Sequence, residues 1–201
     1  MTITTEIFHF DGSMVFLDSI YSTLLHCEAQ SATNQELFLA EAIAFRIFRN
    51  FERITRAVFL ESCITLVAPS GGRISSKLTC GDWKTAEEIL KAGNRFLDWG
   101  NIENTRNLAS LVFENGFPIS DMFAPINSTL TSLQAIRNFI AHDSEEAERK
   151  FRRVVPNYLQ PSANPETAAK LLLGRRSIRG PQTLRIIMDH VKTLTTIYGQ
   201  L

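Results

Sequence analysis

The sequence predicts an all-α protein, on three observations. Apolar residues recur at steps of three and four through most of the chain, which is the spacing that lays one stripe along a helix. Glycine and proline gather between these segments rather than within them. No segment alternates apolar and polar residues over the length of a β-strand. We therefore expect helices packed as a bundle.

The N-terminal third predicts two helices of unequal length. The first is about four turns long and follows the possible capping residues Asp11 and Ser13. A polar break at residues 29–34 separates it from a helical pattern over residues 35–66, which contains no glycine or proline. At ~1.5 Å per residue, this second helix would span nearly 50 Å, the length expected of a bundle backbone.

The middle of the chain predicts two shorter helices. Residues 74–83 are expected to form a short strand or a loop, and Asp82 to cap a helix that Gly93 ends or weakens. Another helical pattern runs over residues 102–115. Gly116 is expected to end it, because glycine readily adopts the left-handed conformation found after helix C-termini.

A further amphipathic helix is predicted to start near the turn at residues 124–128 and to reach His142. Asp143 and Glu146 resemble a capping box, in which each side chain accepts from the main-chain N–H of the other. The helix is therefore expected to break and restart directly after His142, and then to stop at Pro156, which cannot donate a hydrogen bond.

The C-terminal part predicts a short helix over residues 165–173, beginning at a proline, and a longer amphipathic helix over residues 184–198. Between them lies a basic hinge, residues 174–181, with the arginines Arg175, Arg176 and Arg179.

The composition is that of an ordinary globular protein and does not by itself indicate a nucleic acid or a membrane as partner. The 21 lysines and arginines balance the 21 aspartates and glutamates, so the formal net charge is 21 − 21 = 0. Any nucleic-acid-binding surface must therefore be a local basic patch. Cys27, Cys63 and Cys80 are odd in number and without a CxxC pair, which argues against disulfides and zinc. The N-terminus has no secretory signal and no apolar run reaches a membrane span. We expect a cytoplasmic protein with no membrane association.

Arg137, Asn138 and His142 form the most informative group, because they are polar residues within an otherwise apolar helical pattern. Histidine, with an unperturbed pKa of ~6.5, can take and give a proton near neutral pH. Arginine binds phosphate bidentately, and asparagine can orient an imidazole or donate to a phosphate. Together they supply what RNA cleavage without a metal requires: proton transfer at the ribose 2′-OH and the 5′-oxygen, and charge stabilisation at phosphorus.

Helix geometry constrains this group. At about 100° per residue, Asn138 and His142 lie within ~40° of each other, whereas Arg137 and His142 diverge by ~140°. For Arg137 and His142 to act on the same phosphate, the helix must break near Ala141, or the arginine side chain must wrap around the helix. Otherwise a second protomer must supply the missing arginine or histidine.

These polar residues also have purely structural interpretations. Asn138 can bond to His142 one turn away and Arg137 can pair with Glu145 or Glu146, giving a satisfied polar cluster. A second basic pattern lies on the long helix, where one face carries Arg46, Arg49, Arg53 and Arg56. This face is either solvated, with Glu52 paired to Arg49 or Arg56, or a strip that follows phosphates.

The order of FRIFRNFERITRAVFLES, WGNIENTRNLASLVFENGFPI and LQAIRNFIAHDS resembles the HEPN superfamily, most closely its RiboL-PSP-HEPN branch. That signature is an arginine, usually followed by a polar residue, with four to six residues before a histidine; Arg137, Asn138 and His142 fit it with four intervening residues. The resemblance covers about residues 35–155 and is loose outside the motif.

The resemblance implies an up-and-down helical bundle of the HEPN type with extra C-terminal helices. It implies one domain over residues 1–201, with a core at about 13–155 and a helical extension at 156–201. It further implies a homodimer whose two motifs form a composite cleft and a ribonuclease that needs no metal or cofactor. Arg137 and His142 are then catalytic, and the supporting or phosphate-binding positions are Asn138, Arg46 and Glu52.

The first functional hypothesis is accordingly a metal-independent endoribonuclease that acts on RNA as a homodimer, in a toxin or antiviral defence system with an antitoxin or other partner protein. Ser144 stands where one toxin branch has an adenylylated tyrosine, which argues against that mode of regulation. The alternative is a catalytically inactive HEPN bundle that dimerises, binds a partner or binds RNA. A DNA-binding regulator ranks third, because no helix-turn-helix pair with a basic recognition helix is evident.

Overall fold

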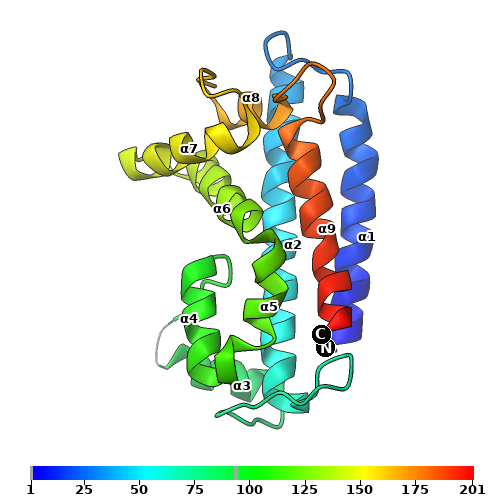
Figure 1. The fold of residues 1–201 in the computed structure, drawn as a ribbon, viewed down its shortest axis with the longest axis vertical. Coiled ribbons are helices and arrows are strands. Elements are labelled where there is room, and N and C mark those ends of the chain that lie inside the picture. The colour runs from blue at the N-terminus through cyan, green and yellow to red at the C-terminus, as the bar shows by residue number, and fades with distance from the viewer. Residues whose placement is uncertain (1, 93–94) are drawn as a thin grey trace. The chain divides into compact units, whose positions relative to one another are not determined.

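The computed structural model describes residues 2–92 and 95–201 (Figure 1). Within these ranges the chain forms α-helices and short 3₁₀ turns and contains no β-strand, so the predicted all-α class is confirmed. The helices are α1 (Ile3–Tyr21), α2 (Asn34–Thr65), α3 (Trp83–Lys91), α4 (Ile102–Val112), α5 (Ile119–Phe123), α6 (Asn127–Ala141), α7 (Glu145–Tyr158), α8 (Ala168–Leu173) and α9 (Thr183–Gln200).

The helices gather in two compact units. The α3–α5 unit comprises Met1–Gly12, Asn50–Asn127 and Lys192–Leu201, and the α6–α8 unit comprises Ser13–Arg49 and Ser128–Val191. Both boundaries of α2 agree with the sequence pattern to one residue. Three of the four borders between the units fall inside α1, α2 and α9, so each of these helices contributes one segment to each unit, and the fourth border follows Asn127, the first residue of α6.

Aromatic side chains form the core of the α3–α5 unit. The ring of Phe59 on α2 lies 5.2 Å from that of Trp99 and 5.0 Å from that of Phe113, measured between centroids. The ring of Phe51, about two turns earlier on α2, lies 5.5 Å from that of Phe123 on α5. Tilted pairs at such distances suit the quadrupoles of the rings, and together they hold α4 and α5 against α2.

In the α6–α8 unit, α6 buries Leu130, Leu133 and Ile136 on one face, as its sequence spacing predicts. The adjoining α7 packs through Phe151, whose ring stacks on that of Phe139 at 4.1 Å. These contacts fix α6 and α7 against each other near the end of α6.

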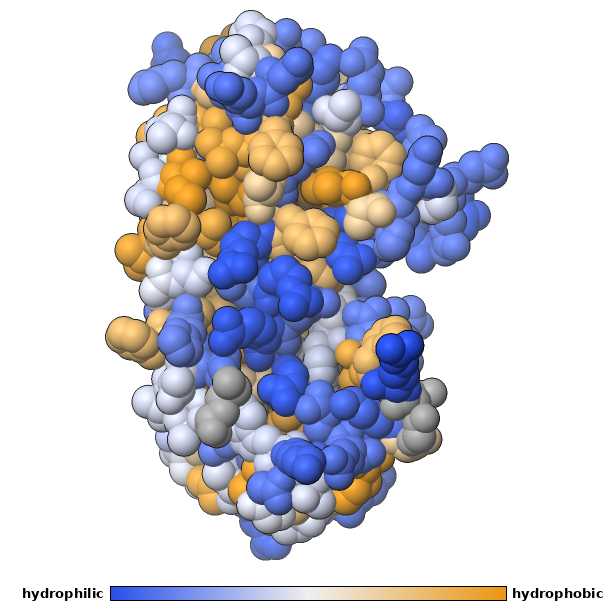
Figure 2. All heavy atoms as spheres, turned by 180° about the vertical axis from the view of Figure 1, so that it is seen from behind, coloured by the Kyte–Doolittle hydropathy of each residue, from blue (hydrophilic) through white to orange (hydrophobic). Residues whose placement is uncertain are grey.

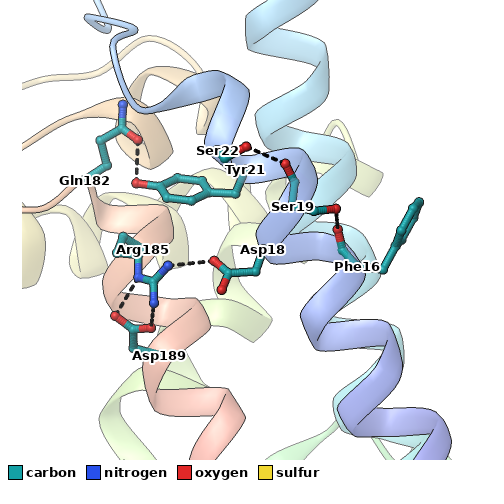
Figure 3. A network of polar contacts seen from close by, with 8 residues as sticks. All are labelled: Phe16, Asp18, Ser19, Tyr21, Ser22, Gln182, Arg185 and Asp189. Carbon is teal, nitrogen blue, oxygen red and sulfur yellow. Dashed lines mark hydrogen bonds and ion pairs between the residues drawn. The ribbon is translucent and has the colours of Figure 1, made fainter.

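A polar network joins α1 to α9 in the same unit (Figure 3). Arg185 on α9 donates to Asp18 of α1 at 2.6 Å and to Asp189 one turn along its own helix. The Tyr21 hydroxyl donates to Gln182 Oε1 at 2.7 Å. The amide nitrogen of this fully buried glutamine then donates to two main-chain carbonyls just beyond α1 at 3.0 and 2.9 Å. Burial of the glutamine is tolerated because both ends of its amide are satisfied.

The first helix starts earlier than its sequence pattern predicts. Asp11 and Ser13 are not caps, because α1 begins at Ile3 and includes both. Phe10 is buried and extends the stripe formed by Met14 and Leu17, so the apolar face continues through Gly12. A glycine inside a helix costs about 1 kcal/mol relative to alanine, which such packing can offset.

Other helix ends also differ from expectation. Pro156 does not stop α7, which continues to the buried Tyr158; in the last turn proline removes only one hydrogen bond. The helix expected to start at Pro165 starts at Ala168, because Thr167 accepts from the N–H of Lys170 at 3.2 Å and caps it.

Two predictions about the middle helices have mixed outcomes. Asp82 caps α3 as predicted, accepting from the N–H of Thr85 at 2.9 Å, whereas the role assigned to Gly93 lies outside the described residues. Helix α4 ends at Val112 rather than Asn115, because the next residue, Phe113, has an extended backbone (φ −113°, ψ 149°), and Asn115 has a positive φ of 54°. Gly116 follows with a φ of 73°.

Candidate functional site

Arg137 is half-buried on α6 and its guanidinium is held by aromatic rings. The Arg137 Cζ lies 5.6 Å from the centroid of Phe45 and 5.3 Å from that of Phe48, both on α2. Its Nη1 donates to the Asn138 side-chain oxygen at 3.0 Å, and its buried Nε has no hydrogen-bond partner among the described residues. The charge is therefore stabilised mainly by ring faces and one amide, and no carboxylate neutralises it through a described ion pair.

His142 is exposed and stands directly after the last residue of α6. Its main-chain N–H donates to the Asn138 carbonyl oxygen at 2.9 Å, so the backbone still follows the helical path at this residue. The helix then breaks and α7 starts at Glu145. The predicted break after Ala141 is confirmed.

The cap of the restarted helix is Ser144 rather than Asp143. The Ser144 hydroxyl accepts from the N–H of Ala147 at 3.2 Å, and Ser144 has the extended backbone typical of a capping residue. Glu146 pairs with Lys150 at 2.9 Å, and this hydrogen bond holds the pKa of the Glu146 carboxyl below its usual value. The predicted capping box is therefore wrong, because its two members are replaced by a serine cap and a surface ion pair.

His142 lies in a shallow depression at the break between α6 and α7. The residues that line it are Phe139, Ile140, Ala141, His142, Asp143, Ser144, Glu145 and Glu148. Three of them carry carboxylates, of which Glu148 is paired with Arg152 at 3.1 Å, and the lining itself contains no lysine or arginine. By itself, the depression offers a proton-transfer group but an electrostatic environment that disfavours phosphate.

The satisfied polar cluster predicted for the motif takes a different form from the one expected. The Asn138 side chain bonds to Arg137 instead of His142, and Glu146 pairs with Lys150 instead of Arg137. Arg137 and His142 thus belong to different surroundings: the guanidinium lies over rings of α2, and the imidazole lines the depression. The large angle between them on the helix is consistent with this separation.

The arginine strip of α2 is engaged in ion pairs with other helices. Arg53 donates to the buried Glu6 of α1 at 3.0 Å, and Arg56 donates to Glu87 of α3 at 3.2 and 2.7 Å. Of the two partners predicted for Glu52, Arg49 and Arg56, the second is therefore engaged with Glu87 instead. These contacts make this part of the strip a structural face, and they weaken its interpretation as a path for phosphates.

The remaining predicted positions on α2 fall in different units. Arg46 is exposed and belongs to the α6–α8 unit, together with Arg137 and His142. Glu52 is half-buried and belongs to the α3–α5 unit. Their assignment as supporting residues stays a prediction.

Sequence reasoning missed Phe45 and Phe48 as the residues that hold Arg137. They are three residues apart on α2 and so share a face, but nothing in the local sequence links them to an arginine on α6. The presence of two aromatic residues on one face of a long helix was the signal that the sequence offered.

In the described ranges, no three histidine, cysteine, aspartate or glutamate side chains are grouped so that they could hold a metal ion. None of the helices described here combines the length and apolar character needed to cross a bilayer. Comparisons with protein-family models, with curated proteins and with solved structures found no match for this chain.

Proposed function

We propose that this protein is a metal-independent endoribonuclease that acts as a homodimer. The observation that carries the proposal is an exposed imidazole, His142, at a helix break one turn beyond a paired arginine and asparagine, Arg137 and Asn138. The spacing of these three residues is also what resembles the HEPN ribonucleases. A role in a toxin or defence system, with an antitoxin or similar partner in the cytoplasm, belongs to the same proposal.

The proposed chemistry follows from the residue types. His142 takes the proton of a ribose 2′-OH as that oxygen attacks the adjacent phosphorus, and it can return a proton to the departing 5′-oxygen. Arg137 stabilises the charge that accumulates on the phosphoryl oxygens. The products are one strand with a 2′,3′-cyclic phosphate and one with a free 5′-hydroxyl.

The homodimer is proposed because one chain does not assemble these groups. Carboxylates surround His142, and the Arg137 guanidinium lies against Phe45 and Phe48. A second copy can supply the missing cation to each histidine.

The same unit offers apolar surface that a second copy can cover. Val15, Phe16 and Phe38 are 69%, 63% and 73% exposed, and Figure 2 shows apolar side chains gathered on the face drawn there. Clusters of exposed apolar side chains commonly mark protein interfaces.

The first test is RNA cleavage by the purified protein in excess chelator. We expect cleavage to persist in EDTA and to fall by about 10²-fold or more in His142→Ala, the loss typical of a missing general acid–base. His26→Ala is the matched control, because His26 is another exposed histidine of the same unit. Loss of cleavage in EDTA, or full cleavage by His142→Ala, would contradict the proposal.

The composite site has its own test by mixing two inactive variants, Arg137→Gln and His142→Ala. In a mixed dimer, one site receives the intact histidine of one copy and the intact arginine of the other. We therefore expect mixing to restore part of the cleavage. If both residues act within one chain, every site keeps one defect and mixing restores nothing. Thermal unfolding of each variant checks that both remain folded.

The second candidate is a non-catalytic bundle that binds a partner protein or RNA. The carboxylates beside His142 favour a partner protein over RNA at this place, because Asp143 and Glu145 repel a phosphate backbone and Glu148 is paired with Arg152 at 3.1 Å. This candidate predicts no cleavage by the wild type under any condition. It also predicts that His142→Ala changes only oligomeric state or stability.

A further inference from the structure

The basic loop, residues 174–180, connects α8 to α9 in the α6–α8 unit and is fixed by its own main chain and by its neighbours. The Arg175 guanidinium donates to the carbonyl oxygens of Gly180 and Leu25, each at 2.9 Å. The Gln160 side-chain amide donates to the Arg176 carbonyl oxygen at 2.8 Å, and Gly180 N–H donates to the Ser177 carbonyl oxygen at 2.9 Å. The backbone is thus held at both ends and in the middle.

This loop forms one wall of a cavity of ≈ 1020 Å³. That volume is large enough for a nucleotide, since pockets for small molecules measure about 300–1,000 Å³. The other walls come from the end of α8, from residues 159–165 and from residues 28–30.

Positive charge is concentrated in this cavity although the chain as a whole is neutral. Four of its lining residues are cationic and one is acidic: Lys170, Arg175, Arg176, Arg179 and Glu28. Lys170 pairs with Glu166 at 2.6 Å, and Arg175 Nε lies 3.9 Å from Glu28 without a hydrogen bond. Arg176 and Arg179 are exposed, and among residues 2–92 and 95–201 neither guanidinium has an ion-pair partner.

We propose that this cavity binds the phosphate of a nucleotide. Two guanidinium groups on a fixed loop can each bind phosphate oxygens with two parallel N–H bonds, and little ordering of the main chain is needed on binding. The accessible apolar side chains of the lining, Ala163, Pro165 and Ile178, provide a surface for a base or ribose. The site is separate from the His142 depression in its lining residues, and it stands whether or not the chain cleaves RNA.

The phosphate can come from a free nucleotide or from an RNA strand. Calorimetric titrations with ATP and with a ten-nucleotide 2′-O-methyl RNA distinguish these sources, because the modified RNA lacks the 2′-OH needed for cleavage. Binding of ATP but not RNA assigns the site to free nucleotides. Binding of RNA but not ATP assigns it to a strand, and binding of both assigns it to the shared phosphate.

The test variant is Arg176→Gln/Arg179→Gln, which removes two exposed charges from the loop. Its control is Arg149→Gln/Arg153→Gln, which removes two exposed charges from α7 in the same unit. We expect the loop variant to weaken binding of the recognised probe by roughly tenfold or more, as the loss of charged hydrogen bonds does. The control should change it by less than about twofold. Failure of both probes to bind, or equal weakening in both variants, would overturn the proposal.

Discussion

At the scale of single residues, the surroundings of Arg137 determine what it can do. Phe45 and Phe48 attract its charge while leaving one buried N–H without an acceptor. A cation held by rings instead of a carboxylate keeps its full charge for an incoming anion. In the proposed dimer, this is the property a phosphate-stabilising arginine needs.

Buried thiols give a residue-scale prediction of low reactivity. Burial, with a contribution from Glu36, raises the pKa of Cys27 to about 11, and burial raises that of Cys63 to about 12. The thiolate is the reactive form, so both should react slowly at pH 8. We expect Ellman's reagent to titrate three thiols after unfolding but neither of these two promptly before it. Rapid labelling of Cys27 or Cys63 in the folded protein, located by mass spectrometry, would contradict this.

The ion pair between Arg56 and Glu87 gives a prediction about pH. The hydrogen bond from Arg56 holds the pKa of Glu87 below its ordinary 4.5. The folded state therefore gains stability above the unfolded pKa, and this gain disappears as the pH falls through the folded value. We expect Glu87→Gln to lower the free energy of unfolding by about 1 kcal/mol at pH 7.

Urea denaturation at several pH values checks this prediction. The difference between Glu87→Gln and wild type should shrink as the pH falls from 4.5 downward. Glu88→Gln, an exposed neighbour on the same helix, is the control and should change stability little at any pH. A difference that is constant with pH would show that the ion pair is not its cause.

At the scale of elements, local sequence signals predicted most helices but not all of their ends. The unbroken pattern of α2 and the Asp82 cap were predictable because both depend on near neighbours in sequence. The choice between Asp143 and Ser144 as the capping residue of α7 was not predictable. Either side chain can cap a helix, and the packing of α7 determines which of them does. Ala147 and Phe151 must both face inward, and this fixes where the helix starts.

The assignment of this cap can be tested directly. Ser144→Ala removes the side-chain acceptor for the N–H of Ala147 and should lower the free energy of unfolding by about 1 kcal/mol. Asp143→Ala should have a much smaller effect, since Asp143 lies outside the helix. Urea denaturation of both variants provides the measurement, and a larger loss in Asp143→Ala would reverse the assignment.

At the scale of the whole molecule, the site depends on contacts that no local pattern reports. Arg137 meets Phe45 and Phe48 across about ninety residues of sequence, and Arg56 finds Glu87 rather than the nearby Glu52. The motif itself was visible because its spacing is local. The carboxylates next to His142 and the arginines of residues 174–181 were likewise visible in the sequence, whereas the cavity that these arginines form with residues 28–30 and 159–165 emerged only once the chain was folded.

The division into two units leads to a prediction about cooperativity. Since three of the four unit borders lie inside α1, α2 and α9, unfolding one unit alone would break three helices, so we expect a single transition. Both tryptophans, Trp83 and Trp99, belong to the α3–α5 unit, whereas far-ultraviolet circular dichroism reports on all helices. The two signals should therefore give superimposable urea curves. Separate midpoints would mean that the units unfold independently.

The uninterrupted course of α2 also restricts how this chain can evolve. One inserted residue near Arg49 would turn everything beyond it by about 100° and misdirect the aromatic side chains that follow, including Phe51 and Phe59. Insertions and deletions should therefore be rare within Asn34–Thr65 among homologues, whereas the connection before α3 can vary in length. Phe45 and Phe48, which hold Arg137 of α6, should then keep a constant spacing to the rest of α2 across large differences in sequence.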